Sequence, residues 1–114
     1  LTDNELGPGG SYDVAPDWRQ QLVRFLGGVD TLIHDGMYSA AMLESRAGWG
    51  HSTPEQAIEL ARDAKCRRLV LFHHEPEHDD AAIDALLAGA RRHATQEAPG
   101  LAVDAAMEGM ALTL

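Results

Sequence analysis

Residues 48–76 read GWGHSTPEQAIELARDAKCRRLVLFHHEP, and this stretch carries the strongest structural signals in the chain. Thr53 is placed to cap a helix, with Pro54 at the first helical position and Gln56 completing a capping box. An apolar helical face follows, and residues 68–72 (RLVLF) then form an almost uninterrupted apolar run. A strand that is buried on both faces has such a composition. The stretch therefore predicts a loop, a capped helix and a buried strand, in that order.

The preceding segment pairs another helix with another strand. Residues 18–26 (WRQQLVRFL) have apolar side chains at helical spacing, and a pair of glycines follows them and ends the helix. Residues 29–35 (VDTLIHD) contain β-branched side chains and are expected to form a short strand. Residues 3–16 are rich in glycine and proline and predict a loop. Residues 36–53 are ambiguous, because MYSAAMLESR fits a helix and AGWGHST fits a glycine-containing loop.

The segment after the buried strand continues the alternation. A helix is expected from about Asp79 to His93, with acidic residues at its start and basic residues at its end, as the helix dipole favours. Residues 101–114 (LAVDAAMEGMALTL) are expected to contain one or two short strands. The predicted order is helix, strand, helix, strand, helix, strand. Such an alternation implies crossover connections and a layered α/β architecture.

The composition permits one folded unit and argues against several classes of partner. The 114 residues fit one modest domain or part of a larger one, and 45% of them are hydrophobic. The net charge of -9 makes nucleic acid a poor partner, because an acidic surface repels phosphate backbones. No apolar run approaches the roughly 18 residues that span a bilayer. The single cysteine, Cys66, fits a reducing compartment, so we expect a cytoplasmic protein without a membrane partner.

Polar side chains gather where the predicted strands end. His34 and Asp35 close the first strand, and His73 begins a His-His-Glu run directly after the second. His51 lies in the loop before the capped helix, and Asp3 heads the first loop. Ligands of open α/β sheets bind beyond the carboxyl ends of the strands. Histidine and carboxylate together suit zinc, manganese or iron, so these positions are candidates for a metal site.

Spacing alone leaves simpler interpretations open for each of these residues. The sequence contains no HxH and no cysteine pair. Asp3 is equally explained as a turn residue, His34 as a half-buried histidine with hydrogen bonds, and His51 as part of a helix cap. Asp35 can stabilise the turn that follows its strand. Residues 74–78 are expected on a solvated loop, and the spacing does not decide whether either of their histidines shapes a pocket.

Residues 48–76 resemble the later part of metallo-β-lactamase-fold phosphodiesterases and of RNase Z, in which a Gly-His-Ser-Thr loop opens a helix. In those families the next strand ends in a metal-binding histidine. Residues 30–38 (DTLIHDGMY) are similar to the preceding family segment, and residues 105–114 (AAMEGMALTL) are similar to the closing strands of the phosphodiesterase-like group. The resemblance covers most of the chain from Asp30 onward. It implies an α/β fold that is the C-terminal half of a metallo-β-lactamase-like αββα sandwich.

Carried onto this sequence, the resemblance implies four site residues. His73 matches the family's last metal ligand. Asp3 matches the aspartate that bridges both metals, although the family's common Gly-Asp-Thr form is absent around it. His51 matches the RNase Z histidine that is proposed to donate a proton to the leaving oxygen, and Asp35 is expected to orient it. The implied cofactors are two divalent metal ions, zinc first, with manganese or iron as alternatives.

The family's HxHxDH motif, which carries most of the other metal ligands, is absent from these 114 residues. We therefore expect residues 1–114 to form a partial metallo-β-lactamase-like domain that is inactive by itself. Its metal site would be completed by the missing N-terminal half of the same domain. That half would also cover one face of the sheet, so exposed apolar surface and formation of a homo-oligomer are expected.

The expected function is metal-dependent hydrolysis of a small phosphodiester by the complete parent protein. A compact substrate such as a cyclic nucleotide fits the acidic chain better than tRNA does. Hydrolysis of a thioester, lactone or lactam is an alternative within the same fold, and a degenerate module for interaction or regulation is a non-enzymatic one. A response-regulator-like domain would use Asp35 as its phosphoacceptor, but the expected acidic pair and lysine are not evident around it.

Overall fold

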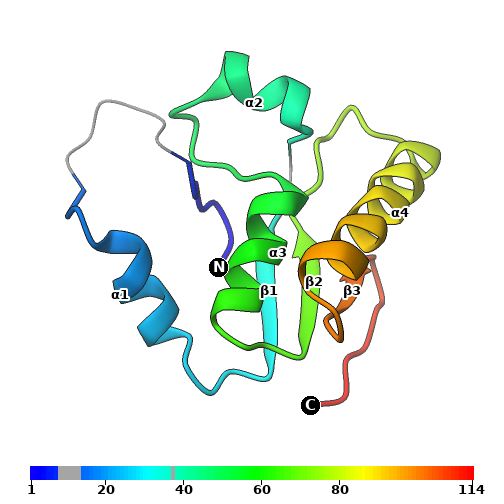
Figure 1. Cartoon of the computed structure of the whole chain (residues 1–114). Coiled ribbons are helices and arrows are strands. Elements are labelled where there is room, and N and C mark those ends of the chain that lie inside the picture. Colours follow the sequence, from blue (N-terminus) through cyan, green and yellow to red (C-terminus); the bar gives the residue numbers. More distant parts are fainter. Residues whose placement is uncertain (8–13, 37) are drawn as a thin grey trace.

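The computed structural model describes residues 1–7, 14–36 and 38–114, and it shows one small sheet flanked by helices (Figure 1). Residues 8–13 of the predicted first loop, and Met37 of the ambiguous segment, lie outside the described residues. In chain order the elements are α1 (Trp18–Phe25), β1 (Thr31–Asp35), α2 (Ala40–Arg46), α3 (Pro54–Asp63), β2 (Arg68–Phe72), α4 (Asp80–Glu97) and β3 (Ala102–Ala105).

These elements confirm the predicted alternation of helix and strand and resolve its open points. The ambiguous segment contains the short helix α2, and the tail contains one strand, β3. The last helix continues to Glu97 instead of ending near His93, because no helix-breaking residue follows His93 until Pro99. None of the helices in the described part of the chain is long and apolar enough to cross a membrane.

The start of α3 has the capping box that the sequence predicts. The Thr53 hydroxyl accepts a hydrogen bond from the backbone N–H of Gln56, and the Gln56 side chain accepts one from the Thr53 N–H at 3.0 Å. Pro54 occupies the first helical position, where no backbone donor is needed. The reciprocal bonds fix the point at which the loop carrying His51 becomes a helix.

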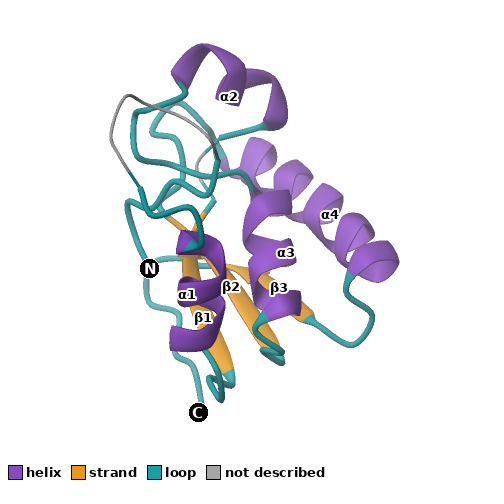
Figure 2. Cartoon of the chain, turned by 60° about the vertical axis from the view of Figure 1, so that its left-hand side comes forward, coloured by secondary structure: helices purple, strands orange, loops and turns teal. Residues whose placement is uncertain are grey.

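The three strands are parallel and lie in the order β1-β2-β3. Consecutive strands advance in one direction across the sheet, so right-handed crossovers place α3 and α4 on the same face (Figures 1 and 2). We call this the covered face. Its strand residues are buried with Ala57, Ile58 and Leu60 of α3 and with Ala90 and Ala94 of α4 in one core cluster. The strand residues of the covered face are Leu32, Leu69, Leu71 and Val103.

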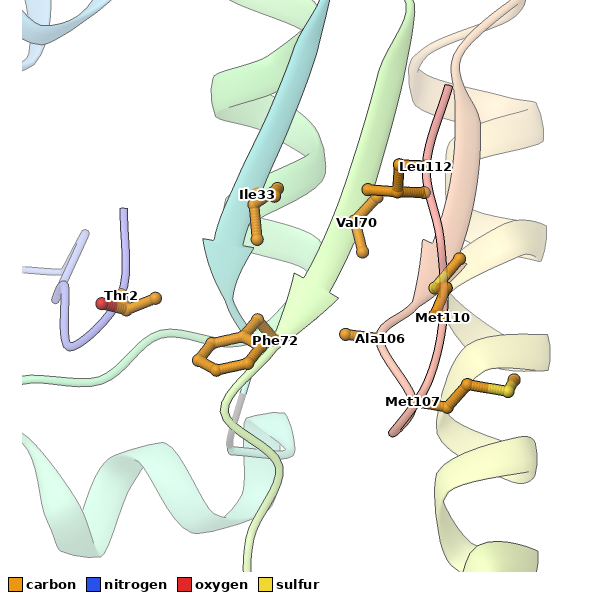
Figure 3. A pocket seen from close by; sticks show the side chains of 8 residues that line it. All are labelled: Thr2, Ile33, Val70, Phe72, Ala106, Met107, Met110 and Leu112. Atoms are coloured by element: carbon orange, nitrogen blue, oxygen red, sulfur yellow. The ribbon is translucent and has the colours of Figure 1, made fainter. Parts of the chain in front are cut away.

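The opposite face of the sheet, which we call the open face, carries Ile33 and Phe72, which are partly exposed, and Val70, which is buried. Side chains alternate along a strand, so these residues point away from the helical layer. A shallow apolar pocket of about 250 Å³ lies on this face and is shown in Figure 3. Ile33 remains 41% exposed and Phe72 44%, so the predicted exposure of apolar surface on one face is present. The other residues that line the pocket are Thr2, Ala106, Met107, Met110 and Leu112.

Candidate metal and proton-transfer site

The carboxyl edge of the sheet brings the four predicted site residues together. Asp35 ends β1 and is paired in register with Phe72, so His73 emerges at the same edge. Leu1 binds along β1 through hydrogen bonds to Ile33 and Asp35, and this places Asp3 beside the strand end. Each of Asp3, Asp35, His51 and His73 offers one ligand atom, and these atoms all lie within 4.8 Å of one another.

Asp35 is the centre of this group. Its Oδ2 atom lies 2.8 Å from Nδ1 of His51 and 3.1 Å from Nδ1 of His73, while Oδ1 accepts the backbone N–H of Ser52 at 3.0 Å. The carboxyl group is fully buried, and a buried carboxylate is stable only when hydrogen-bonded or paired in this way. An ionised carboxylate only accepts, so the hydrogen of each imidazole lies on Nδ1. Asp35 therefore makes the expected contact with His51, and it also accepts a hydrogen bond from His73, which the sequence did not predict.

The two predicted metal ligands share an unusual backbone conformation. Asp3 has φ = 50° and His73 has φ = 60°, both in the left-handed region that side chains disfavour. Oδ1 of Asp3 lies 3.2 Å from Nδ1 of His73. Such residues cost on the order of 1–3 kcal/mol each and cluster at functional sites. The strained backbone at both positions therefore supports a functional role for Asp3 and His73.

Ser52 joins the first segment of the chain to the loop that carries His51. Its hydroxyl accepts the backbone N–H of Leu6 at 3.0 Å and donates to the carbonyl of Asn4. The side chain is fully buried, so these bonds satisfy it in the absence of water. The sequence marks Ser52 only as part of a loop, because its partners lie 46 and 48 residues away.

His34 lies next to Asp35, outside the four-residue group, and is a neutral imidazole. It is fully buried, more than the half-buried position expected from the sequence, and desolvation lowers its pKa. Its Nδ1 donates to the carbonyl of Asp35 at 2.7 Å, and the side-chain amide of Asn4 donates to its Nε2 at 2.9 Å. Both ring nitrogens are thus used, and His34 is a structural link between the first segment and β1.

An outer layer of side chains surrounds His51. The ring of Tyr38 meets the His51 ring edge-on at 5.3 Å, and the rings of His51 and His73 are 4.6 Å apart. Glu75, expected on a solvated loop, is instead buried, because Arg46 pairs with it at 2.8 Å. The sequence did not single out Arg46, since its segment was ambiguous. His74, which lies near the carbonyl of Ala106, is outside the four-residue group.

The donor set fits a divalent cation. Two carboxylates and two imidazoles are ligands of zinc and of the neighbouring borderline metals. A histidine ligand commonly donates its second ring N–H to a carboxylate, which is how Asp35 contacts both histidines. Structural zinc ions take about four ligands each, so these four residues are too few for two ions.

Comparison with known proteins gives a consistent family and fold. The profile described as "Beta-lactamase superfamily domain" matches residues 11–74. The chain is 40% identical over 68 residues to ribonuclease BN of Cronobacter sakazakii, covering 60% of this chain and 22% of that protein. It is 36% identical over 77 residues to ribonuclease Z of Picrophilus torridus, covering 66% of this chain and 25% of that protein. The chain thus spans a quarter or less of the length of these relatives.

A solved structure extends the likeness to the fold of most of the chain. The crystal structure of the metallo-beta-lactamase fold protein YhfI from Bacillus subtilis superposes with a TM-score of 0.58 at 21% sequence identity. The superposition covers 90% of this chain and 36% of that protein. The parallel strands and the helices on the covered face therefore belong to a known fold.

Proposed function

This chain belongs to the β-lactamase superfamily, in its RNase Z-like branch, and from that membership we propose that it supplies part of a metal-dependent phosphodiesterase centre. The observation that carries the proposal is the convergence of Asp3, Asp35, His51 and His73 at one sheet edge. Two of them, Asp35 and His51, form the buried carboxylate–imidazole pair that proton transfer requires.

Asp3 and His73 would hold the cation. Divalent ions in such centres lower the pKa of water and withdraw charge from phosphoryl oxygens. Zinc suits the donor set best, with manganese or iron as alternatives, and two ions are proposed for the complete centre. Asp35 holds His73 by its Nδ1–H at 3.1 Å, which fixes the ring orientation before any ligand arrives.

His51 would protonate the leaving oxygen of the substrate. Asp35 fixes its Nδ1–H at 2.8 Å, so Nε2 is the atom that holds and releases the transferred proton. The buried Asp35 carboxylate holds the ring from the Nδ1 side, which leaves Nε2 for the substrate. The edge-on contact with Tyr38 restricts rotation of the His51 ring, so the donor atom keeps its direction.

A compact phosphodiester is the substrate we propose. The ribonuclease names of the two relatives support phosphodiester chemistry. The net charge of -9 opposes the binding of a long phosphate backbone and supports a small substrate. The lone cysteine, Cys66, is buried and unpaired by disulfide, which supports a cytoplasmic location.

The remaining ligands are proposed to come from an N-terminal half of the same domain. Asp3 and His73 alone are too few ligands for a metal centre, and the apolar open face offers a surface against which a second layer can pack. Residues 1–114 alone are therefore expected to bind metal weakly and to have no hydrolytic activity.

The test measures metal content and bis-p-nitrophenyl phosphate hydrolysis on the complete natural protein that contains this chain. His73→Ala should lose both metal and activity, whereas His51→Ala should lose activity and keep its metal. Thr95→Ala, at an exposed position of α4, is the matched control and should leave both unchanged. A protein without bound metal and without activity would replace the proposal with a binding module.

A further inference from the structure

The loop before His51 carries an aromatic side chain that the metal and proton-transfer site does not use. Trp49 is 66% exposed, which is costly for the largest apolar side chain of an acidic surface. The loop that presents it is held firmly. The backbone N–H groups of Gly48 and Gly50 donate to the two carboxylate oxygens of Glu5 at 2.8 and 3.0 Å. Both glycines have φ near 90°, a conformation that side chains rarely adopt.

Arg46 supports the indole from one side. Its guanidinium carbon lies 5.6 Å from the centre of the Trp49 ring and 5.4 Å from the centre of the Tyr38 ring. The buried carboxylate of Glu75 anchors it at 2.8 Å. Tyr38 in turn meets the His51 ring at 5.3 Å. A continuous series of contacts, through the Arg46 guanidinium and the Tyr38 ring, therefore connects the exposed indole to the proton donor.

We propose that Trp49, backed by Arg46, is a stacking subsite for the planar base of a nucleotide whose phosphodiester lies beside His51. This inference rests on the proposed function and names its substrate class. Trp49 and His51 are two residues apart, so their Cα atoms are within about 7.6 Å of each other. One nucleotide can therefore reach both.

The chemistry of the two side chains selects a base over an aliphatic group. An exposed indole stacks on the π-face of any base, and the guanidinium behind it adds cation–π attraction. Recognition of this kind needs only one nucleotide, so it is compatible with the net charge of -9 that opposes a long backbone. The clamp by Glu5 orients the ring before binding, which lowers the entropic cost of association.

The experiment uses the chain of residues 1–114 without added metal and follows the indole N–H signals by NMR. The chain has two tryptophans, Trp18 in α1 and Trp49, so the second ring provides an internal reference. Adenosine monophosphate should shift the Trp49 signal saturably and leave Trp18 unchanged. Ribose 5-phosphate, which lacks the base, should shift neither.

Variants separate stacking from general loss of structure. Trp49→Ala should weaken adenosine monophosphate binding at least about fivefold, measured from the chemical shifts of the ligand or by calorimetry. Trp49→Phe should keep most of the affinity, and Trp18→Phe should keep all of it. Unchanged affinity in Trp49→Ala, equal binding of ribose 5-phosphate, or no response of Trp49 up to millimolar nucleotide would overturn the subsite. If residues 1–114 bind the nucleotide as expected but the complete natural protein has no hydrolytic activity, only the proposed function is overturned.

Discussion

The covered and open faces of the sheet are built from neighbouring residues of the same strands, and they have different surroundings. In β1, Leu32 is buried in the helical core while Ile33 is 41% exposed. In β2, Leu71 is buried and Phe72, the next residue, is 44% exposed. At these positions both faces are apolar, so composition does not distinguish them. The difference arises because sequential parallel strands with right-handed crossovers place their helices on one side only.

The contrast shows that helices bury one face of the sheet, whereas apolar side chains on the other face remain partly exposed. A strand with one solvated face usually alternates apolar and polar residues, whereas β2 reads RLVLF. The site lies where the two faces meet, at the carboxyl edge, and Asp35 is buried there despite its charge. The following changes test the contrast, from the largest expected effect on stability to the smallest.

Leu69→Ala on the covered face should lower the free energy of unfolding by about 2–5 kcal/mol, because it opens a cavity in a packed core. Ile33→Ala on the open face should lower it by less than about 1 kcal/mol, since the side chain is already half in solvent. Urea denaturation of both variants measures the two values. Equal losses would mean that the two faces are equally packed.

The buried His34 should make the stability of the fold depend on pH. Burial lowers its pKa in the folded chain below the unfolded value of about 6.5, so the unfolded state binds more protons in that window. Stability should therefore fall as the pH drops below about 6.5 towards the folded-state pKa. Urea midpoints across that range, in chelator, measure the slope. His34→Gln should flatten it, and an unchanged slope in this variant would assign the dependence to other groups.

Thr53→Ala should lower the free energy of unfolding by about 1 kcal/mol, because it removes the capping box of α3, the helix that shields the covered face. Thr95→Ala removes a threonine hydroxyl from the exposed side of α4 and is the matched control. Thermal and urea unfolding compare the pair. A control that is as destabilised as Thr53→Ala would remove the special role of the cap.

Phe72→Gln should change stability least, by about 0.5 kcal/mol or less, because nearly half of the ring is exposed. It should nevertheless reduce self-association and binding of a hydrophobic dye, since it removes the largest apolar ring of the open face. Sedimentation velocity and dye fluorescence measure this. Association that persists unchanged would place the contact surface elsewhere.

The sequence by itself determined the order of the elements, the capped start of α3, the buried strand β2 and, through its family resemblance, the four residues that converge. These features depend on local signals: Thr53 and Gln56 are three residues apart, and RLVLF is continuous. Local hydrogen bonds and hydrophobic periodicity are encoded over one or two turns of chain.

Only the tertiary structure decided how those residues are connected. The bond between His73 and Asp35 spans 38 residues, that between Ser52 and Leu6 spans 46, and that between Arg46 and Glu75 spans 29. The tertiary structure also decided which face of the sheet is open. That choice depends on the handedness of two crossovers and not on the composition of any strand. Contacts of this range form when packing brings strand ends together, and no single segment of sequence specifies them.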